Sequence, residues 1–381
     1  MKSFKVGFDA KRAVLNYTGL GNYSRLAIDA ISTRLPDNKY YLYTPKVKAN
    51  DRLDELLGRD NITIRRPDSF TGRAFGSLWR SMGITSQLKT DGMDLFHGLS
   101  NELPLGIART GIPSVVTIHD VIFIPHPEFY HRADVEICRR KFGYAARVAD
   151  RVIAISECTR RDLVRYYGVD RSKIDVVYQG CHASFYRNVS PDEIDAVRRK
   201  YGLHNPYIIA VGTVESRKNQ LIAVEGLRGL PADVHLVIVG RRTGYAAMLD
   251  AAIASYGLGD RVHFMEGVPF ADLPVLYAGA VMASYTSFYE GFGIPVIEAI
   301  AAGVPVIAAT GSCLEEAGGP GAVYVNPQDV EHFVANARLL LDDEVLRRSM
   351  VEAGRSYIGR FSFDNFASGL VAVYEKLGIK N

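Results

Sequence analysis

The segment that decides the fold is Val281-Met-Ala-Ser-Tyr-Thr-Ser-Phe-Tyr-Glu290-Gly-Phe-Gly-Ile-Pro-Val-Ile-Glu298. It opens with an apolar run typical of a buried strand and passes through a glycine-rich turn. It then continues into an apolar helix, where Pro295 suits the first turn. Gly303 suits the end of that helix, directly before a second apolar run at 304–308. Two strands joined by a helix form the repeating unit of a parallel sheet, so the segment predicts an α/β protein.

The same alternation of short apolar runs and amphipathic segments extends along nearly the whole chain. We expect helices at 23–33, 139–149, 158–167, 219–227 and 330–341. Strands are expected at Lys5–Phe8, Tyr40–Tyr43, Leu95–His97, Ser114–Ile118, Arg151–Ile155, Ile174–Val177, Tyr207–Val211, His235–Val239, Val262–Met265, Val281–Ala283, Pro305–Ala308 and Ala322–Val325. This pattern predicts parallel sheets covered by helices, with ligands bound at the carboxyl ends of the strands.

The alternation is interrupted once, at Gly180–Pro191, where a polar stretch bounded by proline follows a strand. A chain of 381 residues is too long for one typical core, so we place a domain boundary there. We predict one domain at residues 1–182 and a second at 188–362, with the ligand in the cleft between them. Residues 363–381 are expected to supply a C-terminal helix that packs back on the first domain.

Composition and charge exclude several classes of protein. No apolar run approaches the roughly 20 residues of a membrane span, and the chain opens into a strand-like run rather than a signal peptide. The four cysteines show no CxxC spacing and no clustered histidines, so we expect neither a zinc site nor a disulfide framework. We therefore expect a cytoplasmic protein that holds no metal.

The net charge of +3 is unevenly distributed along the chain. Residues 1–180 hold 28 Lys and Arg against 20 Asp and Glu, whereas the remainder holds 17 against 22. A basic first half favours an anionic partner, although solvated helix faces would give the same count. Nucleic acid is not expected, because the sequence contains no zinc finger, RNP motif or basic heptad region.

Glu290 and Glu298 are carboxylates that bracket the glycine-rich turn. Glu290 precedes the turn and Glu298 lies about one turn inside the helix, so both can face one pocket. The unpaired N–H groups of residues 291–294 at the helix N-terminus favour phosphate or sugar oxygens. Two acceptor carboxylates beside such N–H groups suit a nucleotide sugar. A glutamate in this position also occurs for purely electrostatic reasons, so neither residue alone is decisive.

Three further motifs follow predicted strands. Arg217 and Lys218, after the strand at 207–211, could neutralise a diphosphate leaving group, although such a pair is often merely solvated. The loop Tyr17-Thr-Gly19-Leu-Gly21 follows the first strand but lacks the third glycine of a dinucleotide fingerprint. His119 follows the strand at 114–118 and could serve the ligand or be a hydrogen-bonded core histidine.

Together these motifs resemble the retaining glycosyltransferases of family 4, which have the GT-B fold of two Rossmann-like domains facing a central cleft. The Glu290–Glu298 element and the following helix carry most of the resemblance. The resemblance implies that Glu290 contacts the transferred sugar, Glu298 the ribose, and Arg217 with Lys218 the diphosphate. It also implies a donor-sugar contact for His119. The other implied donor contacts are Gly19, Gly21, Val268, Gly291, Phe292, Gly293 and Ile294.

The acceptor-side residues implied are His97, Asn101 and Asp120. Thr213 departs from the family pattern, because many members carry an arginine there. The motifs most resemble mannosyltransferases of polysaccharide and O-antigen assembly. This implies metal-independent hexosyl transfer with retention, from GDP-mannose to a glycan or polyprenyl-linked acceptor at the inner membrane face. An epimerase or hydrolase of the same fold and a non-catalytic sugar-nucleotide-binding protein remain as alternatives.

Overall fold

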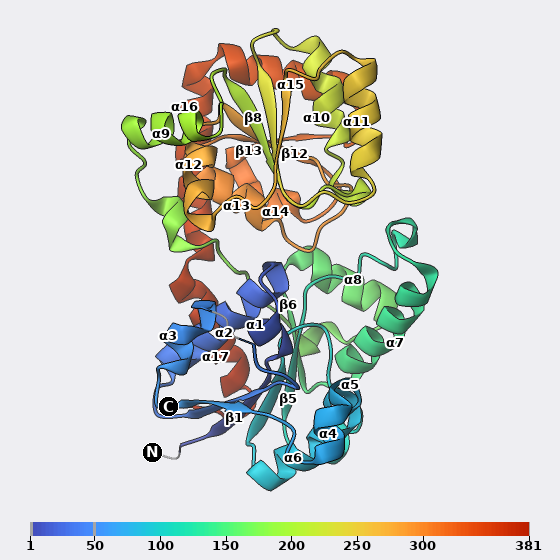
Figure 1. The fold of residues 1–381 in the computed structure, drawn as a ribbon. Helices are drawn as coiled ribbons and strands as arrows, with labels where there is room; N and C mark the ends of the chain where they lie inside the picture. Colours follow the sequence, from blue (N-terminus) through green and yellow to red (C-terminus); the bar gives the residue numbers. More distant parts are fainter. Residues whose placement is uncertain (1–2, 49–50, 381) are drawn as a thin grey trace. The chain divides into compact units, whose positions relative to one another are not determined.

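The computed structural model describes residues 3–48 and 51–380. Contacts between residues divide the chain into two compact units. Unit 1 is Met1–Gln179 with Ser362–Asn381, and unit 2 is Gly180–Phe361. Each described unit is a parallel sheet with helices on both faces (Figure 1), which confirms the predicted α/β class.

Unit 1 contains a seven-stranded sheet in the order β3-β2-β1-β4-β5-β6-β7. All its strand pairs are parallel. Its strands are β1 (Lys5–Asp9), β2 (Lys39–Tyr43), β3 (Ile62–Arg65), β4 (Leu95–Gly98), β5 (Ser114–Ile118), β6 (Arg151–Ala154) and β7 (Ile174–Val176). The order reverses between β1 and β4, and ligands of open parallel sheets bind at the carboxyl ends beside such a reversal.

The helices of unit 1 cover a sheet whose central strands are buried on both faces. They are α1 (Lys11–Leu15), α2 (Gly19–Arg34), α3 (Asp54–Leu57), α4 (Phe70–Ala74), α5 (Gly76–Leu78), α6 (Ile84–Asp91), α7 (Arg132–Val148), α8 (Glu157–Tyr167) and α17 (Phe363–Glu375). A π-helical turn, η2 (Trp79–Gly83), joins α5 to α6. Capping residues define both ends of helix α8. Ser156 accepts a hydrogen bond from the Thr159 N–H at the N-terminus, and Gly168 ends the helix in the left-handed conformation.

Helix α17 joins unit 1 although it follows unit 2 in sequence, as the red helix among blue elements shows (Figure 1). The Tyr374 hydroxyl lies 2.8 Å from His97 Nδ1 on β4. The ring of Phe366 packs edge-on against Tyr23 of α2. Arg34 of α2 forms an ion pair with Asp364. These contacts bury the apolar face of the C-terminal helix.

Unit 2 contains a six-stranded parallel sheet in the order β10-β9-β8-β11-β12-β13. Its strands are β8 (Tyr207–Val211), β9 (His235–Val239), β10 (Val262–Met265), β11 (Met282–Tyr285), β12 (Val306–Ala309) and β13 (Ala322–Val325). Its helices are α9 (Pro191–Lys200), α10 (Leu221–Gly226), α11 (Ala246–Ser255), α12 (Leu273–Ala278), α13 (Ile294–Ala301), α14 (Leu314–Gly318), α15 (Val330–Asp342) and α16 (Glu344–Ile358). The order reverses between β8 and β11.

Candidate functional site

The reversal between β8 and β11 brings two distant segments together in unit 2. Ile208 and Ile209 of β8 pair with Met282 and Ala283 of β11. The segment after β8 leads into the 3₁₀ turn Ser216–Lys218, and the segment after β11 leads to Glu290. The sheet order therefore places the predicted cationic pair beside the first predicted glutamate.

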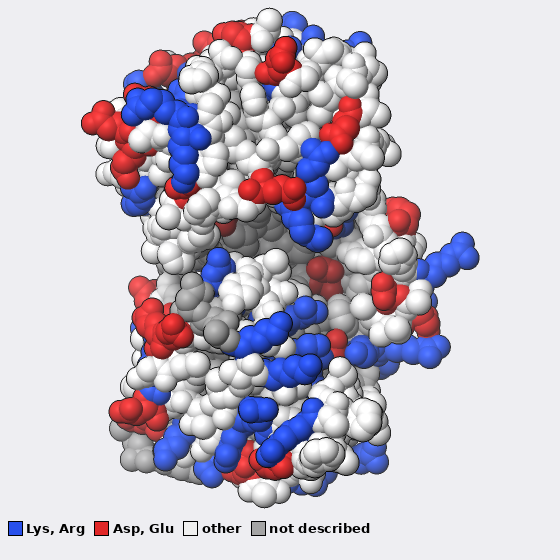
Figure 2. Space-filling view, viewed as in Figure 1, with Lys and Arg blue, Asp and Glu red and all other residues white. Residues whose placement is uncertain are grey.

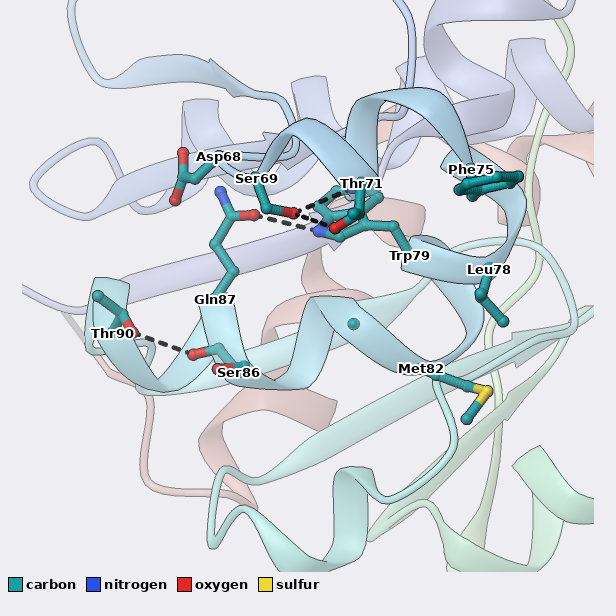
Figure 3. A pocket seen from close by; sticks show the side chains of 12 residues that line it. Asp68, Ser69, Thr71, Phe75, Leu78, Trp79, Met82, Ser86, Gln87 and Thr90 are labelled. Atoms are coloured by element: carbon teal, nitrogen blue, oxygen red, sulfur yellow. Dashed lines mark hydrogen bonds between the residues drawn. The ribbon is translucent and has the colours of Figure 1, made fainter.

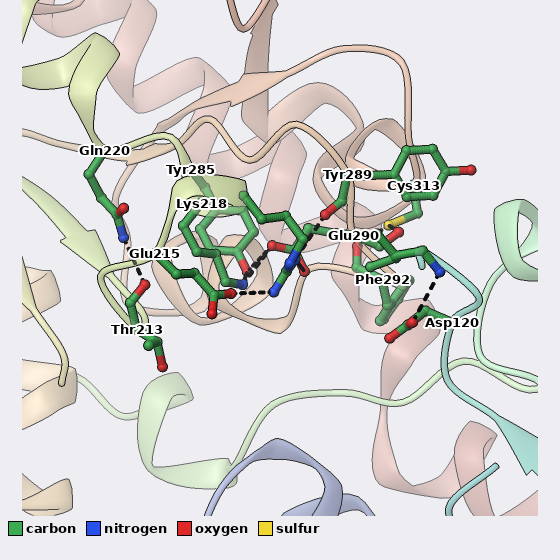
Figure 4. Close-up of polar contacts among 12 residues, drawn as sticks. Asp120, Thr213, Glu215, Lys218, Gln220, Tyr285, Tyr289, Glu290, Phe292 and Cys313 are labelled. Carbon is green, nitrogen blue, oxygen red and sulfur yellow. Dashed lines mark hydrogen bonds and ion pairs between the residues drawn. The ribbon is translucent and has the colours of Figure 1, made fainter. Parts of the chain in front are cut away.

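Glu290 is the centre of a buried charge cluster. Its carboxylate lies 2.6 Å from Lys218 Nζ and 2.9 Å from an Arg217 guanidinium nitrogen. The hydroxyl of Tyr285 donates to Glu290 at 3.1 Å and accepts from Lys218 at 2.7 Å. Figure 4 shows Lys218 and Glu290 pointing toward one another beside the Tyr285 ring. The structure thus joins three residues that the sequence assigned to one ligand.

The cluster keeps Glu290 ionised. Burial by itself would raise the pKa of this carboxyl, because a charged group loses its hydration. The Lys218 ammonium and then the Arg217 guanidinium outweigh burial and lower the pKa of Glu290 to about 2. The residue is therefore an acceptor of hydrogen bonds at any physiological pH, which suits it to sugar hydroxyls.

The backbone around the cluster is fixed from several sides. Arg217 donates to the Tyr289 carbonyl at 2.9 Å, and Cys313 donates through sulfur to the Glu290 and Phe292 carbonyls. Asn219 adopts the left-handed conformation and donates to the carbonyls of Thr286 and Pro327. Cys313 and Asn219 therefore hold the loops in place, a role that the sequence alone did not assign to either side chain.

Gly293 has two structural reasons to be glycine. Its φ of 113° lies in the left-handed region, and a Cβ there would lie 2.7 Å from Leu314 Cδ2. Ile294 then begins helix α13, followed by Pro295, which has no N–H group that could be left unpaired in the first turn. The turn thus approaches α14 closely and presents a helix N-terminus beside Glu290.

Glu298 has different surroundings from Glu290. Its carboxylate lies 3.4 Å from the Tyr277 hydroxyl of α12, and burial raises its pKa to about 7. The two glutamates share no hydrogen-bonding partner among the described residues. Their joint contact with one ligand therefore stays a prediction, and Glu298 is close to half protonated at neutral pH.

The neighbouring strand end contributes residues that sequence reasoning missed. Gly240 follows β9, and a Cβ on it would lie 1.9 Å from the Gly212 carbonyl oxygen. The backbone N–H of Arg242 donates to Glu266 at 2.7 Å. The signal that could have found them is a glycine followed by two arginines directly after an apolar strand. Val268, predicted to lie beside the base, follows this Glu266 turn.

The predicted residues of unit 1 have clear structural partners. His119 is buried, and its Nε2 lies 3.0 Å from the Leu99 carbonyl, so this nitrogen carries the proton and Nδ1 is left as an acceptor. Burial lowers its pKa to about 4, so the ring is neutral. Asn101 Oδ1 accepts from the His119 N–H at 2.6 Å, and Asp120 accepts from the Ile122 N–H. Asn101 therefore shapes the loop on which His119 stands.

His97 is fully buried and has both ring nitrogens within hydrogen-bond distance of core hydroxyls. Nδ1 faces Tyr374 and Nε2 lies 2.9 Å from Thr117 Oγ1. Burial first, and then the nearby His119, lower its pKa to about 3. These contacts give His97 the environment of a structural core residue rather than that of a ligand contact.

The glycine loop also has a packing explanation. A Cβ on Gly21 would lie 1.9 Å from the Asn16 carbonyl oxygen, whereas one on Gly19 would meet nothing within 4 Å. Gly21 is therefore required by the turn into α2. Gly19 is the position of this pair where a ligand could approach the backbone.

A pocket of about 370 Å³ lies in unit 1 and includes residues beside the reversal between β1 and β4. Arg80 bridges two carboxylates in it, Asp9 at 2.6 Å and Glu102 at 2.9 Å. Leu103, Pro104, Leu105, Arg140, Lys141 and Tyr144 complete much of its wall. Sequence reasoning missed this set, because Arg80 lies in no strand-end motif.

Residues 3–48 and 51–380 contain neither a metal-binding cluster nor a membrane-spanning helix. No group of three or more His, Cys, Asp or Glu side chains there is arranged to hold a metal ion. In the same ranges, every helix is too short or too polar to cross a membrane.

Known protein families match both units. Residues 193–357 match Glycosyl transferases group 1, and residues 29–185 match Glycosyltransferase Family 4. The chain is 30% identical over 355 residues to the MMP alpha-(1->4)-mannosyltransferase of Mycolicibacterium hassiacum, covering 87% of this chain and 80% of that one. It is 28% identical over 290 residues to O-antigen chain mannosyltransferase B of Escherichia coli, covering 74% of each.

Solved structures agree on the fold. The Anabaena protein HepE, in complex with UDP and glucose, superposes with a TM-score of 0.77 at 19% identity, covering 98% of this chain and 100% of that one. The lipopolysaccharide glycosyltransferase WaaG superposes with a TM-score of 0.72 at 18% identity, covering 97% and 99%. Similarity at this identity confirms the predicted GT-B fold. The chain therefore belongs to family 4 of the group 1 glycosyltransferases, enzymes that transfer a sugar from a nucleotide sugar.

Proposed function

We propose that this enzyme transfers mannose from GDP-mannose, with retention at the anomeric carbon, to a hydroxyl of a glycan or polyprenyl-linked acceptor in surface polysaccharide synthesis. The observation that carries the donor site is the Glu290 cluster with Arg217 and Lys218 at the β8/β11 reversal. The choice of mannose is supported by two relatives whose names describe mannosyltransferases.

In this proposal the cations act on the leaving group. Arg217 and Lys218 are paired with Glu290, and Arg217 also with Glu215 at 2.7 Å, so the cluster itself has no net charge. The two cations nevertheless lie side by side, where they favour a diphosphate whose negative charge grows as the glycosidic bond breaks. The N-terminus of α13 adds a partial positive charge from the helix dipole. Glu290 stays ionised between the cations and accepts hydrogen bonds from the sugar hydroxyls.

The reaction breaks the bond between the anomeric carbon and the β-phosphate oxygen and forms one to the acceptor oxygen. The acceptor proton passes to the departing phosphate oxygen. We assign Glu298 to the ribose, Val268 to the base, and His119, through its accepting Nδ1, to a sugar hydroxyl. The transfer requires no metal ion. Unit 1 supplies the acceptor site, for which the Asp9–Arg80–Glu102 pocket offers charged partners to a polyol.

Donor identity is tested by thermal shift with GDP- and UDP-sugars, followed by NMR of the transfer product. We expect the largest stabilisation with GDP-mannose and a product of retained configuration. A UDP-sugar that stabilises more would replace the donor, and an inverted product would contradict the mechanism. Donor consumption without acceptor would favour an epimerase or hydrolase, and tight binding without any turnover a non-catalytic binding protein.

A lipid-linked acceptor would bring the enzyme to the inner face of the cell membrane as a peripheral protein. The basic first half of the sequence supports this part of the proposal. Figure 2 shows Lys and Arg side chains gathered on the visible face of unit 1.

A further inference from the structure

The segment from α4 to α6 exposes an unusual set of apolar side chains. Phe70 is 85% exposed, Phe75 65%, Leu78 58% and Met82 56%. Nine large hydrophobic residues of the described chain are at least half exposed, and four of them lie within these thirteen positions. Scattered exposed hydrophobics need no explanation, but a concentration of this kind marks an interaction surface.

Three of these side chains line one pocket, and Phe70 begins the helix that precedes them. Phe75, Leu78 and Met82 line one side of a pocket of about 480 Å³, and Ser86, Gln87 and Thr90 line the other (Figure 3). Leu105, itself 51% exposed, adjoins them, since its N–H donates to the Ser81 carbonyl at 2.7 Å. We call Phe70, Phe75, Leu78, Met82 and Leu105 the apolar face.

The fold does not need this face for its own stability, because other residues hold the segment in place. Trp79 is buried and donates through its indole nitrogen to Gln87 at 3.2 Å. Ser69 caps α4 by accepting a hydrogen bond from the Gly72 N–H. Pro45 lies so close to Gly76 that a Cβ there would be 2.6 Å away. Trp79 and Gln87 also line the pocket, so these anchors position Phe75, Leu78 and Met82 without covering them.

The exposed charged residues close to the apolar face in sequence are mostly basic. Between residues 66 and 90 the exposed charged side chains are Arg66, Arg73 and Lys89 against Asp68, so three positive charges oppose one negative charge. Lys46 and Lys48 are also exposed and directly follow Pro45. An apolar surface with a positive rim complements a bilayer that carries anionic headgroups.

We propose that the apolar face and its basic rim dock unit 1 on an anionic lipid surface, with Phe70 and Phe75 entering the headgroup region. The proposed function supplies only the biological reason for this docking, which is access to a lipid-linked acceptor. A second copy of the chain is a poorer occupant, because a two-fold interface would bring each positive rim against its counterpart. A bilayer offers both the apolar depth and the opposite charge.

Vesicle flotation of the full-length protein tests the proposal. We expect strong binding to phosphatidylcholine vesicles containing about 30% phosphatidylglycerol and weak binding to phosphatidylcholine alone, since the rim responds to surface charge. The double variant Phe70→Ser/Phe75→Ser should lose about tenfold in binding. Arg66→Glu/Arg73→Glu should remove the preference for anionic vesicles. The matched control, Met248→Ser/Val345→Ser, removes two exposed apolar residues of unit 2 and should bind like wild type.

The readouts separate this proposal from the proposed function. Thermal shift with GDP or UDP reports the fold and donor site of each variant without any membrane. Absence of flotation with both kinds of vesicle, or an equal loss in the control variant, would overturn the docking surface. Sedimentation velocity showing a dimer that Phe70→Ser/Phe75→Ser dissociates would assign the face to a second copy instead.

Discussion

Removing the Lys218 ammonium is the most direct perturbation of the proposed donor site. Lys218→Ala deletes the 2.6 Å contact with Glu290 and the 2.7 Å contact with Tyr285, and leaves Arg217 in place. A charged hydrogen bond contributes about 1.5–3 kcal/mol, and losing one transition-state donor costs about 100- to 1,000-fold in rate. We expect kcat to fall about 100-fold.

The same substitution changes acid stability. Because the folded-state pKa of Glu290 is about 2, against 4.5 for an ordinary glutamate, its ionisation stabilises the fold fully above pH 4.5, and that stabilisation disappears as the pH falls toward 2. The difference corresponds to about 3 kcal/mol. Lys218→Ala should raise this pKa, reduce the stabilisation at pH 7 and shift the acid-unfolding midpoint to higher pH.

Steady-state kinetics with the preferred donor and circular dichroism between pH 2 and pH 7 measure both effects. Lys200→Ala is the matched control, since Lys200 pairs with Asp272 in the same unit but on its exposed surface. Its kinetics and acid stability should stay close to wild type. Near-normal turnover of Lys218→Ala would refute leaving-group stabilisation by this residue, even if acid stability changed as expected.

Three further predictions concern individual residues. Burial raises the pKa of Glu298 to about 7, so the protonated side chain contributes to the free energy of unfolding, and this contribution should be lost as the pH rises through 7. Thermal melts of Glu298→Gln should lack that pH dependence. Gly293→Ala should lower the free energy of unfolding by about 2–3 kcal/mol in urea titrations, because φ at Gly293 is positive and Leu314 occupies the space that a Cβ would need. Gly168 also has a positive φ but open space around it, so Gly168→Ala should cost only about 1 kcal/mol. His97→Asn should lower the free energy of unfolding by about 2 kcal/mol, because it removes core hydrogen bonds. The value of kcat/KM for the acceptor should stay within about threefold of wild type. A selective loss of acceptor affinity would instead show that His97 contacts the acceptor.

The sheets were predictable because each central strand is an uninterrupted apolar run. The run at Ser114–Ile118 is strand β5 at the predicted residues. The run predicted at Val281–Ala283 is observed as β11 at Met282–Tyr285, since Ser284 is buried at the end of the sheet and does not break the strand. Apolar character on both faces makes such segments clear in sequence.

The segment from α4 to α6 was missed for the opposite reason. Three short helices and a π-helical turn give no sustained 3.6-residue period, and exposed Phe70 and Phe75 do not form an inward-facing stripe. The pairing of Arg80 with Asp9 joins residues 71 positions apart and leaves no local signal. Sequence motifs therefore predicted the residues of the Glu290 cluster, whereas the unit 1 pocket and the apolar face required the structure.

Glu290 and Glu298, the two glutamates of the sequence motif, differ in pKa, which their spacing in the sequence could not show. Eight positions apart, Glu290 has its pKa lowered to about 2 by two cations, and Glu298 has its pKa raised to about 7 by burial. Glu290 can only accept hydrogen bonds, but a protonated Glu298 can also donate one. If Glu298 binds ribose hydroxyls as a carboxylate, donor affinity should rise between pH 6 and pH 8 in wild type and not in Glu298→Gln. A flat profile in wild type would mean that the ligand binds both forms equally, and the ribose assignment would lose its physical basis.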